Sequence, residues 1–341
     1  MHGRRLQIDT LRGLACVALV TFHTIGADRM SGLLVADDHA LRLLSDLLGY
    51  LRMPLFAFLS GFVYALRPIS GEARQFIGAK VRRLLVPMLT VGTLFAVLQS
   101  NTPGANFHGH DWALLHIQPV AHYWFLESLF LIFMLIVVLE QRRWLGSRAS
   151  FATVWLASAV LFVIDPLPRA FGLQGAVYLL PFVLLGIGCR RFADEIADFP
   201  ARNSAAALLC LLAAAAWILS AGLPGRNSTI ALGLGASGCV LLLHTRLRSR
   251  GLAFLGAYSY SIFLFHSIFS AASRVVLTGL FGAPFELLLI SGVLAGLALP
   301  VIVELTLKRV GHPIGFWLLG QKPAPKLTSP RFRESTAAMP L

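Results

Sequence analysis

The chain has 341 residues, of which 57% are hydrophobic and only 13% are charged. A soluble domain is close to half apolar and about a quarter charged, so this composition excludes an ordinary soluble globular protein. The formal net charge of +13, taken alone, is compatible with nucleic-acid binding. The distribution of the basic residues along the chain gives that charge a different meaning.

Apolar runs of roughly 16 to 22 residues recur throughout the chain, about the length that crosses ~30 Å of hydrocarbon. We therefore predict an all-α polytopic membrane protein with about ten transmembrane helices. The predicted spans are 6–27, 43–66, 84–99, 120–139, 150–165, 174–190, 204–222, 228–245, 251–271 and 285–304. The connection 165–175 contains two prolines, so it could be partly re-entrant.

Basic residues are unequally divided between alternate loops. With the N-terminus placed in the cytoplasm, they concentrate in the cytoplasmic segments, above all in 67–83 and in the tail after 305. The opposite loops contain only Arg29, Arg42, Arg169, Arg226 and Arg274. This is the positive-inside pattern. It predicts that both termini are cytoplasmic, and it accounts for the net charge without a nucleic-acid partner.

The segments outside the predicted spans are too short to bury a core of their own. We predict one transmembrane domain, 1–310, followed by a cytoplasmic and largely disordered tail, 311–341, that is rich in Pro, Ser and basic residues. The four cysteines lie in apolar stretches without paired spacing, which is typical of packing residues. We predict no metal site.

The first predicted span carries three ionisable residues, Asp9, Arg12 and His23, in the stretch LQIDTLRGLACVALVTFHTI. Such residues are costly in a bilayer and usually face a bundle interior. Arg12 and His23 project within about 20° of one another and lie roughly 16 Å apart along a helix, while Asp9 can pair with Arg12. This stripe predicts a polar cavity that crosses much of the membrane. The alternative is a pair of interfacial charges and a packing histidine.

Two further ionisable residues, Arg52 and Glu127, fall within later spans. An unpaired intramembrane Arg is improbable, so Arg52 is expected to meet a carboxylate, either Glu127 or Asp9. Glu127 could instead pair with His23, an arrangement that general-base chemistry uses. A structural salt bridge explains Arg52 equally well. Ser60 belongs to a Ser-Gly pair that permits close backbone approach.

A basic cluster, Lys80, Arg82 and Arg83, precedes the third span. Its default explanation is topology and contact with anionic lipid, but such residues also bind phosphate groups. The ninth span contains Tyr260 and His266. Packing explains most hydroxyl groups in such a helix, whereas a second intramembrane imidazole is a candidate for function.

These elements, in this order, resemble the acyltransferase-3 family of bacterial integral-membrane O-acyltransferases. The matching stretches are IDTLRGLACVALVTFH, MPLFAFLSGF, the basic cluster before RLLVP, WFLESL and LGAYSYSIFLFH. The resemblance covers residues 4 to about 310. It implies a multi-pass protein of the bacterial cytoplasmic (inner) membrane. It also implies transfer of an acyl group, commonly acetyl, from cytoplasmic acyl-CoA to a hydroxyl of an extracytoplasmic or cell-surface glycan.

The resemblance also implies roles for individual residues. The Arg-x10-His pair of the family corresponds to Arg12 and His23, with His23 as the catalytic residue. The Arg-x-x-Arg element corresponds to Lys80 and Arg83, and a Lys keeps the charge but not bidentate phosphate binding. The residues expected to be catalytic are His23, Glu127 and Arg52; those expected to bind the acyl-CoA are Arg12, Asp9, Lys80, Arg82 and Arg83; and those expected to serve the substrate or the site in other ways are Trp124, Ser60, Tyr260 and His266.

Two other classes of function remain open at this point. A proton-coupled secondary transporter would also use intramembrane Asp, Glu, His and Arg, and a non-catalytic membrane partner would bind glycan or lipid. For the acyltransferase, the donor is acetyl-CoA by default or another acyl-CoA such as succinyl-CoA. The acceptor could be lipopolysaccharide, exopolysaccharide, periplasmic glucan, peptidoglycan or a small glycoside.

Overall fold

The computed structural model of the chain describes residues 2–69, 71–107, 109–118, 120–193, 199–310 and 314–321. Over these residues the protein is helical, with no β-strand. In chain order the elements are α1 (His2–Ile25), α2 (Ala40–Leu66), α3 (Ala73–Lys80), the π-helical segment η1 (Val81–Leu85), α4 (Val86–Asn101), α5 (Trp124–Gln141), α6 (Arg148–Ile164), the 3-10 turn η2 (Ala170–Gly172), α7 (Leu173–Arg191), α8 (Phe199–Ala221), α9 (Thr229–His244), α10 (Arg250–Ala257), α11 (Ser259–Phe281), α12 (Phe285–Val310) and α13 (Ile314–Leu319).

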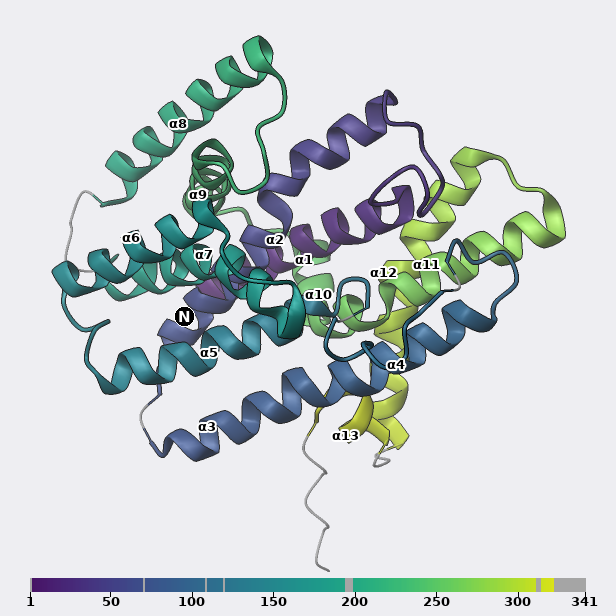
Figure 1. Cartoon of the computed structure of the whole chain (residues 1–341), viewed down its shortest axis with the longest axis horizontal. Helices are drawn as coiled ribbons and strands as arrows, with labels where there is room; N and C mark the ends of the chain where they lie inside the picture. The colour runs from purple at the N-terminus through teal and green to yellow at the C-terminus, as the bar shows by residue number, and fades with distance from the viewer. Residues whose placement is uncertain are drawn as a thin grey trace, which may run out of the picture.

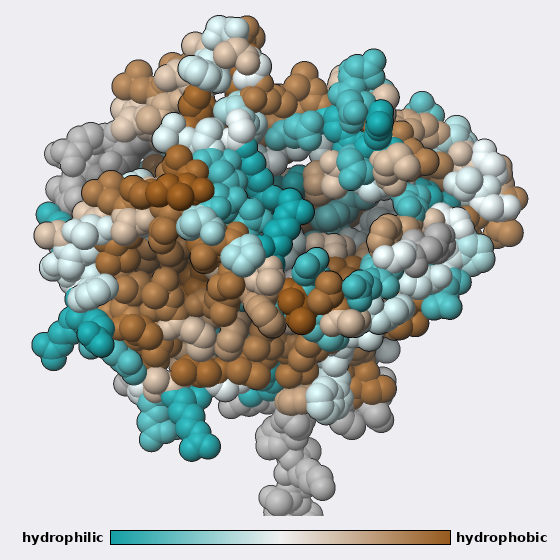
Figure 2. Space-filling view, in the orientation of Figure 1, coloured by the Kyte–Doolittle hydropathy of each residue, from teal (hydrophilic) through white to brown (hydrophobic). Residues whose placement is uncertain are grey.

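The predicted all-α polytopic membrane fold is confirmed. Within the described ranges, eight helical stretches are long and apolar enough to cross a membrane, and α6 and α9 are shorter apolar helices. Together they coincide with the ten predicted spans. Figure 2 shows a broad apolar area on the outer surface, as expected where side chains contact lipid.

Two of the predicted boundaries differ from the structure. The third helical stretch begins at Ala73 rather than at 84, because η1 joins α3 to α4 without a break. The ninth span is divided at Tyr258 into α10 and α11. Of the predicted tail, residues 314–321 are described and include α13, which packs against α4. The other tail residues lie outside the described ranges, so the domain boundary and the cytoplasmic location of the termini stay predictions.

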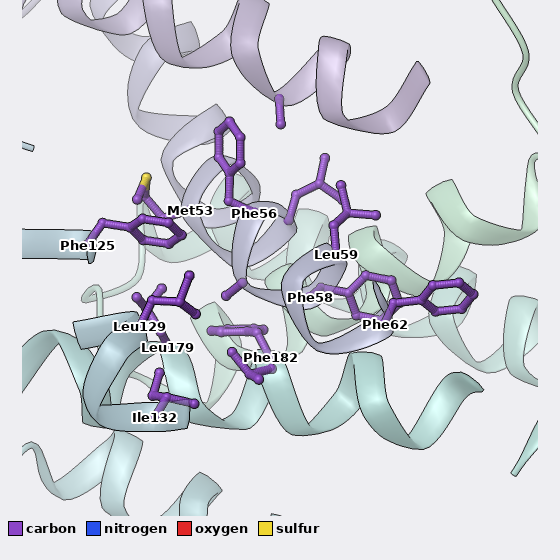
Figure 3. Packing of buried hydrophobic residues seen from close by; sticks show 14 of the residues in the cluster. Met53, Phe56, Phe58, Leu59, Phe62, Phe125, Leu129, Ile132, Leu179 and Phe182 are labelled. Carbon is purple, nitrogen blue, oxygen red and sulfur yellow. The ribbon is translucent and has the colours of Figure 1, made fainter. Parts of the chain in front are cut away.

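The apolar core lies between α2, α5 and α7, and α8 lies beside α9 at the edge of the bundle (Figure 1). Figure 3 shows how side chains of these three core helices interlock. Phe58 of α2, Ile132 of α5 and Phe182 of α7 are all fully buried. Since lipid is as apolar as these side chains, tight packing rather than the hydrophobic effect must hold the helices together.

Glycines bring the helix backbones of α1 and α10 into direct contact. A Cβ atom at Gly13 would lie 1.9 Å from the carbonyl oxygen of Leu252, and one at Gly256 would lie 1.8 Å from that of Asp9. No side chain fits at either position. Gly61 and Gly186 make the same kind of contact between α2 and α7, so small residues set the spacing of both helix pairs.

We predict that Gly256→Ala strongly destabilises the protein, because the added methyl group meets the backbone of α1 rather than a movable side chain. Overpacking of this kind typically costs about 1–3 kcal/mol or more. The measurement is the thermal unfolding temperature of the purified protein in detergent.

Gly251→Ala is the matched control, because Gly251 also lies in α10 and a Cβ there meets nothing within 4 Å. Its unfolding temperature should equal or exceed that of the wild type, since Ala favours helix over Gly by about 1 kcal/mol. Equal unfolding temperatures for the two variants would show that the α1–α10 contact does not limit stability.

Candidate active site

A cavity of about 1000 Å³ opens at one end of the bundle. This end, which we call the cavity end, carries the loops that follow α1 and α4. The opposite end, which carries η1, we call the basic end. The cavity is lined by the last two turns of α1, the first half of α2, the second half of α4, the start of α5, one residue of α7 and the middle of α11, including His23, Arg52, His122, Trp124, Tyr178 and Ser267.

The first half of α2 turns one polar face to this cavity. Ser45, Gly49 and Arg52 recur at helical spacing and all line it, as expected for one face of a helix. Pro54 follows directly and has no N–H to bond the carbonyl of Tyr50, which loosens the helix at this level. The sequence therefore places a polar, locally loosened helical segment against the cavity.

Three histidines from three different segments meet at the cavity: His23 and His122 line it, and His266 packs against both. The ring of His23 on α1 lies 5.0 Å from that of His266 on α11 and 5.4 Å from that of His122, which precedes α5. The rings of His122 and His266 lie 4.5 Å apart. His122 and His266 are buried. His23, which the sequence places on the polar stripe of α1, is therefore joined by two further imidazoles from other segments.

The hydrogen bonds around the cluster indicate which ring nitrogens carry protons. His266 Nδ1 lies 2.8 Å and 2.9 Å from the carbonyl oxygens of Ile262 and Phe263, so it is the donor, and Nε2 keeps its lone pair. Ser267 Oγ lies 3.1 Å from His266 Nε2 and 3.3 Å from His122 Nδ1. With one hydroxyl proton, Ser267 donates to His266 and accepts from His122. His122 Nε2 then has a buried lone pair without a hydrogen-bond partner among the described residues.

This arrangement suits two kinds of chemistry. A neutral imidazole at His23 can accept a proton from a hydroxyl group within the cavity. The three histidines also offer ligand atoms that all lie within 4.8 Å of one another, and neutral imidazole is a common ligand of transition metals. The prediction that the site uses no metal stays a prediction.

Arg52 pairs with no carboxylate among the described residues, so the expected ion pair with Glu127 or Asp9 is not formed. Its guanidinium carbon lies 3.5 Å from the centre of the Phe22 ring. Its Nε and Nη1 atoms are buried and have no hydrogen-bond partner among the described residues. The aromatic face partly replaces a carboxylate, because its quadrupole attracts a cation.

Glu127 faces away from the cavity, and its expected pairing with His23 or Arg52 is not formed either. Its Cβ atom lies against Gly172 of η2, and it is absent from the cavity lining. Its Oε2 atom is buried without a partner among the described residues. The reason is the helical register of α5, which turns Trp124 to the cavity and Glu127 toward η2.

At the basic end, the predicted ion pair between Asp9 and Arg12 is confirmed, with Arg12 Nη1 lying 3.6 Å from Asp9 Oδ1. The structure brings Arg83 within electrostatic range of Arg12, although the two are far apart in sequence. Lys80 lies within range of Arg83, and its Nζ atom sits 3.3 Å from the centre of the Phe133 ring. The predicted donor-binding cations are therefore gathered at one end of the bundle.

The π-helical segment η1 explains how this cluster is held. A π-helix shifts the backbone hydrogen bonds by one residue and often marks a functional site. The hydroxyl of Tyr260 donates to the carbonyl of Arg83, and Arg82 Nε donates to the carbonyl of Gly320 at 3.1 Å. Tyr260 thus fixes the basic segment, whereas Ser60 donates to Phe56 within α2 and does not line the cavity.

The predicted polar cavity does not continue from His23 to Arg12. Leu19 lines the inner end of the cavity, and Arg12 does not line it. Between the two lie Cys16 and Leu19, whose side chains are fully buried. An apolar layer on α1 therefore separates the cavity from the basic end in this conformation.

Sequence reasoning missed several cavity residues. His122 lies just before α5 and Ser267 follows His266, and neither residue carries a sequence signal that separates it from its neighbours. Asp46 lines the cavity six residues before Arg52, and a carboxylate inside an apolar run is a signal that could have found it. Arg226 comes from a loop, and only the structure shows that it stacks over Tyr178 at 4.2 Å.

Comparison with known families gives one match. Residues 5–307 match the model of the acyltransferase-3 family, described as an acyltransferase domain. No curated protein and no solved structure matches the chain. The match spans the bundle from α1 to α12, including the histidine cluster and the basic end. The chain therefore belongs to the acyltransferase-3 family and is a multi-pass membrane acyltransferase.

Proposed function

We propose that this acyltransferase moves an acyl group, by default acetyl, from cytoplasmic acyl-CoA to a hydroxyl of an extracytoplasmic or cell-surface glycan. The observation that carries the proposal is the position of His23, an intramembrane imidazole on the wall of a cavity of about 1000 Å³. A cavity of that size accommodates a sugar ring. Its mixture of aromatic rings and charged groups suits a ligand with both C–H faces and hydroxyl groups.

In the proposed reaction, the neutral imidazole of His23 accepts the proton of the acceptor hydroxyl as its oxygen attacks the thioester carbonyl carbon. The C–S bond breaks, and the coenzyme A thiolate leaves with the proton from His23. In the second form of the mechanism, the imidazole of His23 attacks the thioester carbonyl carbon, the C–S bond breaks and coenzyme A thiolate leaves; the acceptor hydroxyl then takes the acyl group from His23, and its proton passes to the thiolate. His122 and His266 surround His23 in both forms. Orientation of His23 or stabilisation of the oxyanion by Glu127 or Arg52 stays a prediction.

The donor is proposed to bind at the basic end, which the positive-inside pattern predicts to face the cytoplasm. The phosphates of acyl-CoA would meet Arg12, Lys80, Arg82 and Arg83, because such side chains bind phosphate oxygens directly. The buried layer of Cys16 and Leu19 must then open for the thioester to reach His23. We also propose that the protein lies in the bacterial inner membrane.

Family membership does not favour the alternative of a proton-coupled transporter. That reading predicts substrate flux driven by a pH gradient without consumption of acyl-CoA. The two functions therefore separate in a single vesicle assay that follows both quantities.

We predict that His23→Ala lowers acyl transfer by about 10²- to 10⁴-fold, the usual range for loss of a positioned general base. The measurement uses inside-out membrane vesicles supplied with labelled acetyl-CoA and follows label in lumenal glycan and release of free coenzyme A. It is repeated with succinyl-CoA.

His244→Ala is the control, because His244 ends α9 and does not line the cavity. It should retain wild-type transfer. Wild-type transfer by His23→Ala would refute the proposed role of His23, and absence of coenzyme A release by the wild type with both donors would refute the acyltransferase reaction itself.

We predict that Arg83→Gln raises the KM for acetyl-CoA about tenfold, because a charge-assisted hydrogen bond contributes roughly 1.5–3 kcal/mol. The kcat should change much less, since Arg83 lies far from His23, at the opposite end of α1 from the cavity. Steady-state kinetics in the same vesicles measure both quantities.

Arg74→Gln is the matched control, because Arg74 is an exposed cation of the neighbouring helix α3. It should leave KM unchanged. An equal rise in KM for both variants would show that the basic end acts through its general potential and not through a phosphate site at Arg83.

A further inference from the structure

Two arginines of α2 are buried to a similar degree but differ in their partners. Arg42 is 3% exposed, and Arg52 is 8% exposed. Arg42 donates to the carbonyls of Gly26 and Val35, which fastens the loop that follows α1. Arg52 makes no hydrogen bond or ion pair to a described residue, and two of its nitrogen atoms are fully enclosed. Arg42 therefore has a structural role that Arg52 lacks.

A buried guanidinium without an anion is a costly feature. Desolvation strongly disfavours such a charge, and contact with one aromatic ring offsets only part of that cost. Phe22 supplies this contact on one face of Arg52. Arg52 lines the cavity, two of its donors lack a partner among the described residues, and the geometry of the guanidinium fork matches a carboxylate or phosphate group.

The charges around Arg52 favour an anion in the cavity. The arginines that line the cavity are Arg52, Arg226 and Arg274, against the carboxylates of Asp28 and Asp46. Asp46 and Arg226 lie within electrostatic range of Arg52, and neither forms an ion pair with it. The lining is thus positive overall, and its most buried cation, Arg52, forms no ion pair with a described carboxylate.

Aromatic rings surround the same site. Arg226 lies over the rings of both Tyr178 and Trp124, at 4.2 Å and 5.6 Å from their centres. Tyr50 also lines the cavity and donates its hydroxyl to the carbonyl of Pro224 at 2.5 Å. These rings offer flat apolar faces next to the cation, as a sugar that carries an acidic group requires.

We infer that the acceptor carries an anionic group, a carboxylate or a phosphate, which the guanidinium of Arg52 binds next to Phe22. The inference rests on the proposed function only in naming this ligand as the acceptor. The phosphates of acyl-CoA do not fit the site, because the buried layer of Cys16 and Leu19 separates it from the basic end.

The test measures binding without acyl-CoA. Purified wild-type protein in detergent is titrated with glucuronate, glucose 6-phosphate, glucose and inorganic phosphate at constant ionic strength, by calorimetry and by thermal unfolding. We expect at least one of the two anionic sugars to bind about tenfold or more tightly than glucose. The stronger of the two identifies the group as carboxylate or phosphate.

Variants then assign the binding to Arg52. Arg52→Gln should lower the affinity for the anionic sugar to that for glucose, and Arg52→Lys should give an intermediate affinity, because it keeps the charge without the fork. Arg29→Gln removes an exposed charge that does not line the cavity, and should bind as the wild type does. Without ligand, Arg52→Gln should unfold at or above the wild-type temperature, since it removes an unpaired buried charge.

Three results would overturn the inference: equal binding of glucose and both anionic sugars, equal binding of inorganic phosphate and the anionic sugars, or unchanged affinity in Arg52→Gln. Absence of binding by both anionic sugars would do the same. Acyl transfer is measured separately in vesicles, so failure of that assay refutes the proposed function and leaves an anion site at Arg52 standing.

Discussion

The direct backbone contact between α1 and α10 is the constraint on which the site depends. Gly13 and Gly256 leave no room for a side chain between the two helices. Because α10 continues into α11 through Tyr258, this contact also fixes His266 relative to His23. The contact at Gly256 is made with the carbonyl of Asp9, so the turn that carries Arg12 is fixed as well. One helix contact thus sets the geometry at both the cavity end and the basic end.

The partners of the buried polar groups separate structural residues from candidate functional ones. Away from the cavity, two carboxylates have several partners, Glu140 with Arg191 and Tyr64 and Glu304 with Lys308 and Ser261, whereas Glu127 keeps one buried oxygen without a partner among the described residues. At the cavity, Arg52 and His122 keep buried nitrogen atoms without partners among the described residues. A buried polar group without a partner destabilises the fold. A ligand or a proton in the cavity could supply the missing interaction for Arg52 and His122, because both residues line it.

The fold was largely predictable from the sequence, because ten apolar runs of membrane-spanning length carry a strong and repeated signal. The Asp9–Arg12 pair was predictable for a similar reason, since it depends only on helical spacing within α1. Pairings between residues of different helices were not predictable. They depend on how each helix is rotated about its axis, and a helix that is apolar on all sides gives no signal of that rotation. Glu127 shows this: its position in α5 is correct, but its direction toward η2 could not be read from a uniformly apolar helix. His122 and Ser267 became visible only when α11 was placed next to the start of α5.

The apolar layer at Cys16 and Leu19 separates the cavity from the basic end, and this separation would affect hydrolysis of the thioester. A thioester that reached His23 without an acceptor would be open to hydrolysis, because the cavity opens to solvent on that side. While Leu19 closes the inner end of the cavity, the donor at the basic end is kept away from that water. An acceptor bound in the cavity would displace water from His23 and neutralise the charge of Arg52. Because Arg52 of α2 stacks on Phe22, the residue next to His23 on α1, the proposed anion site and the proposed catalytic imidazole are linked through one contact between the two helices. In the proposed reaction, protection of the thioester at Leu19 and proton transfer at His23 would therefore both depend on one short segment of α1.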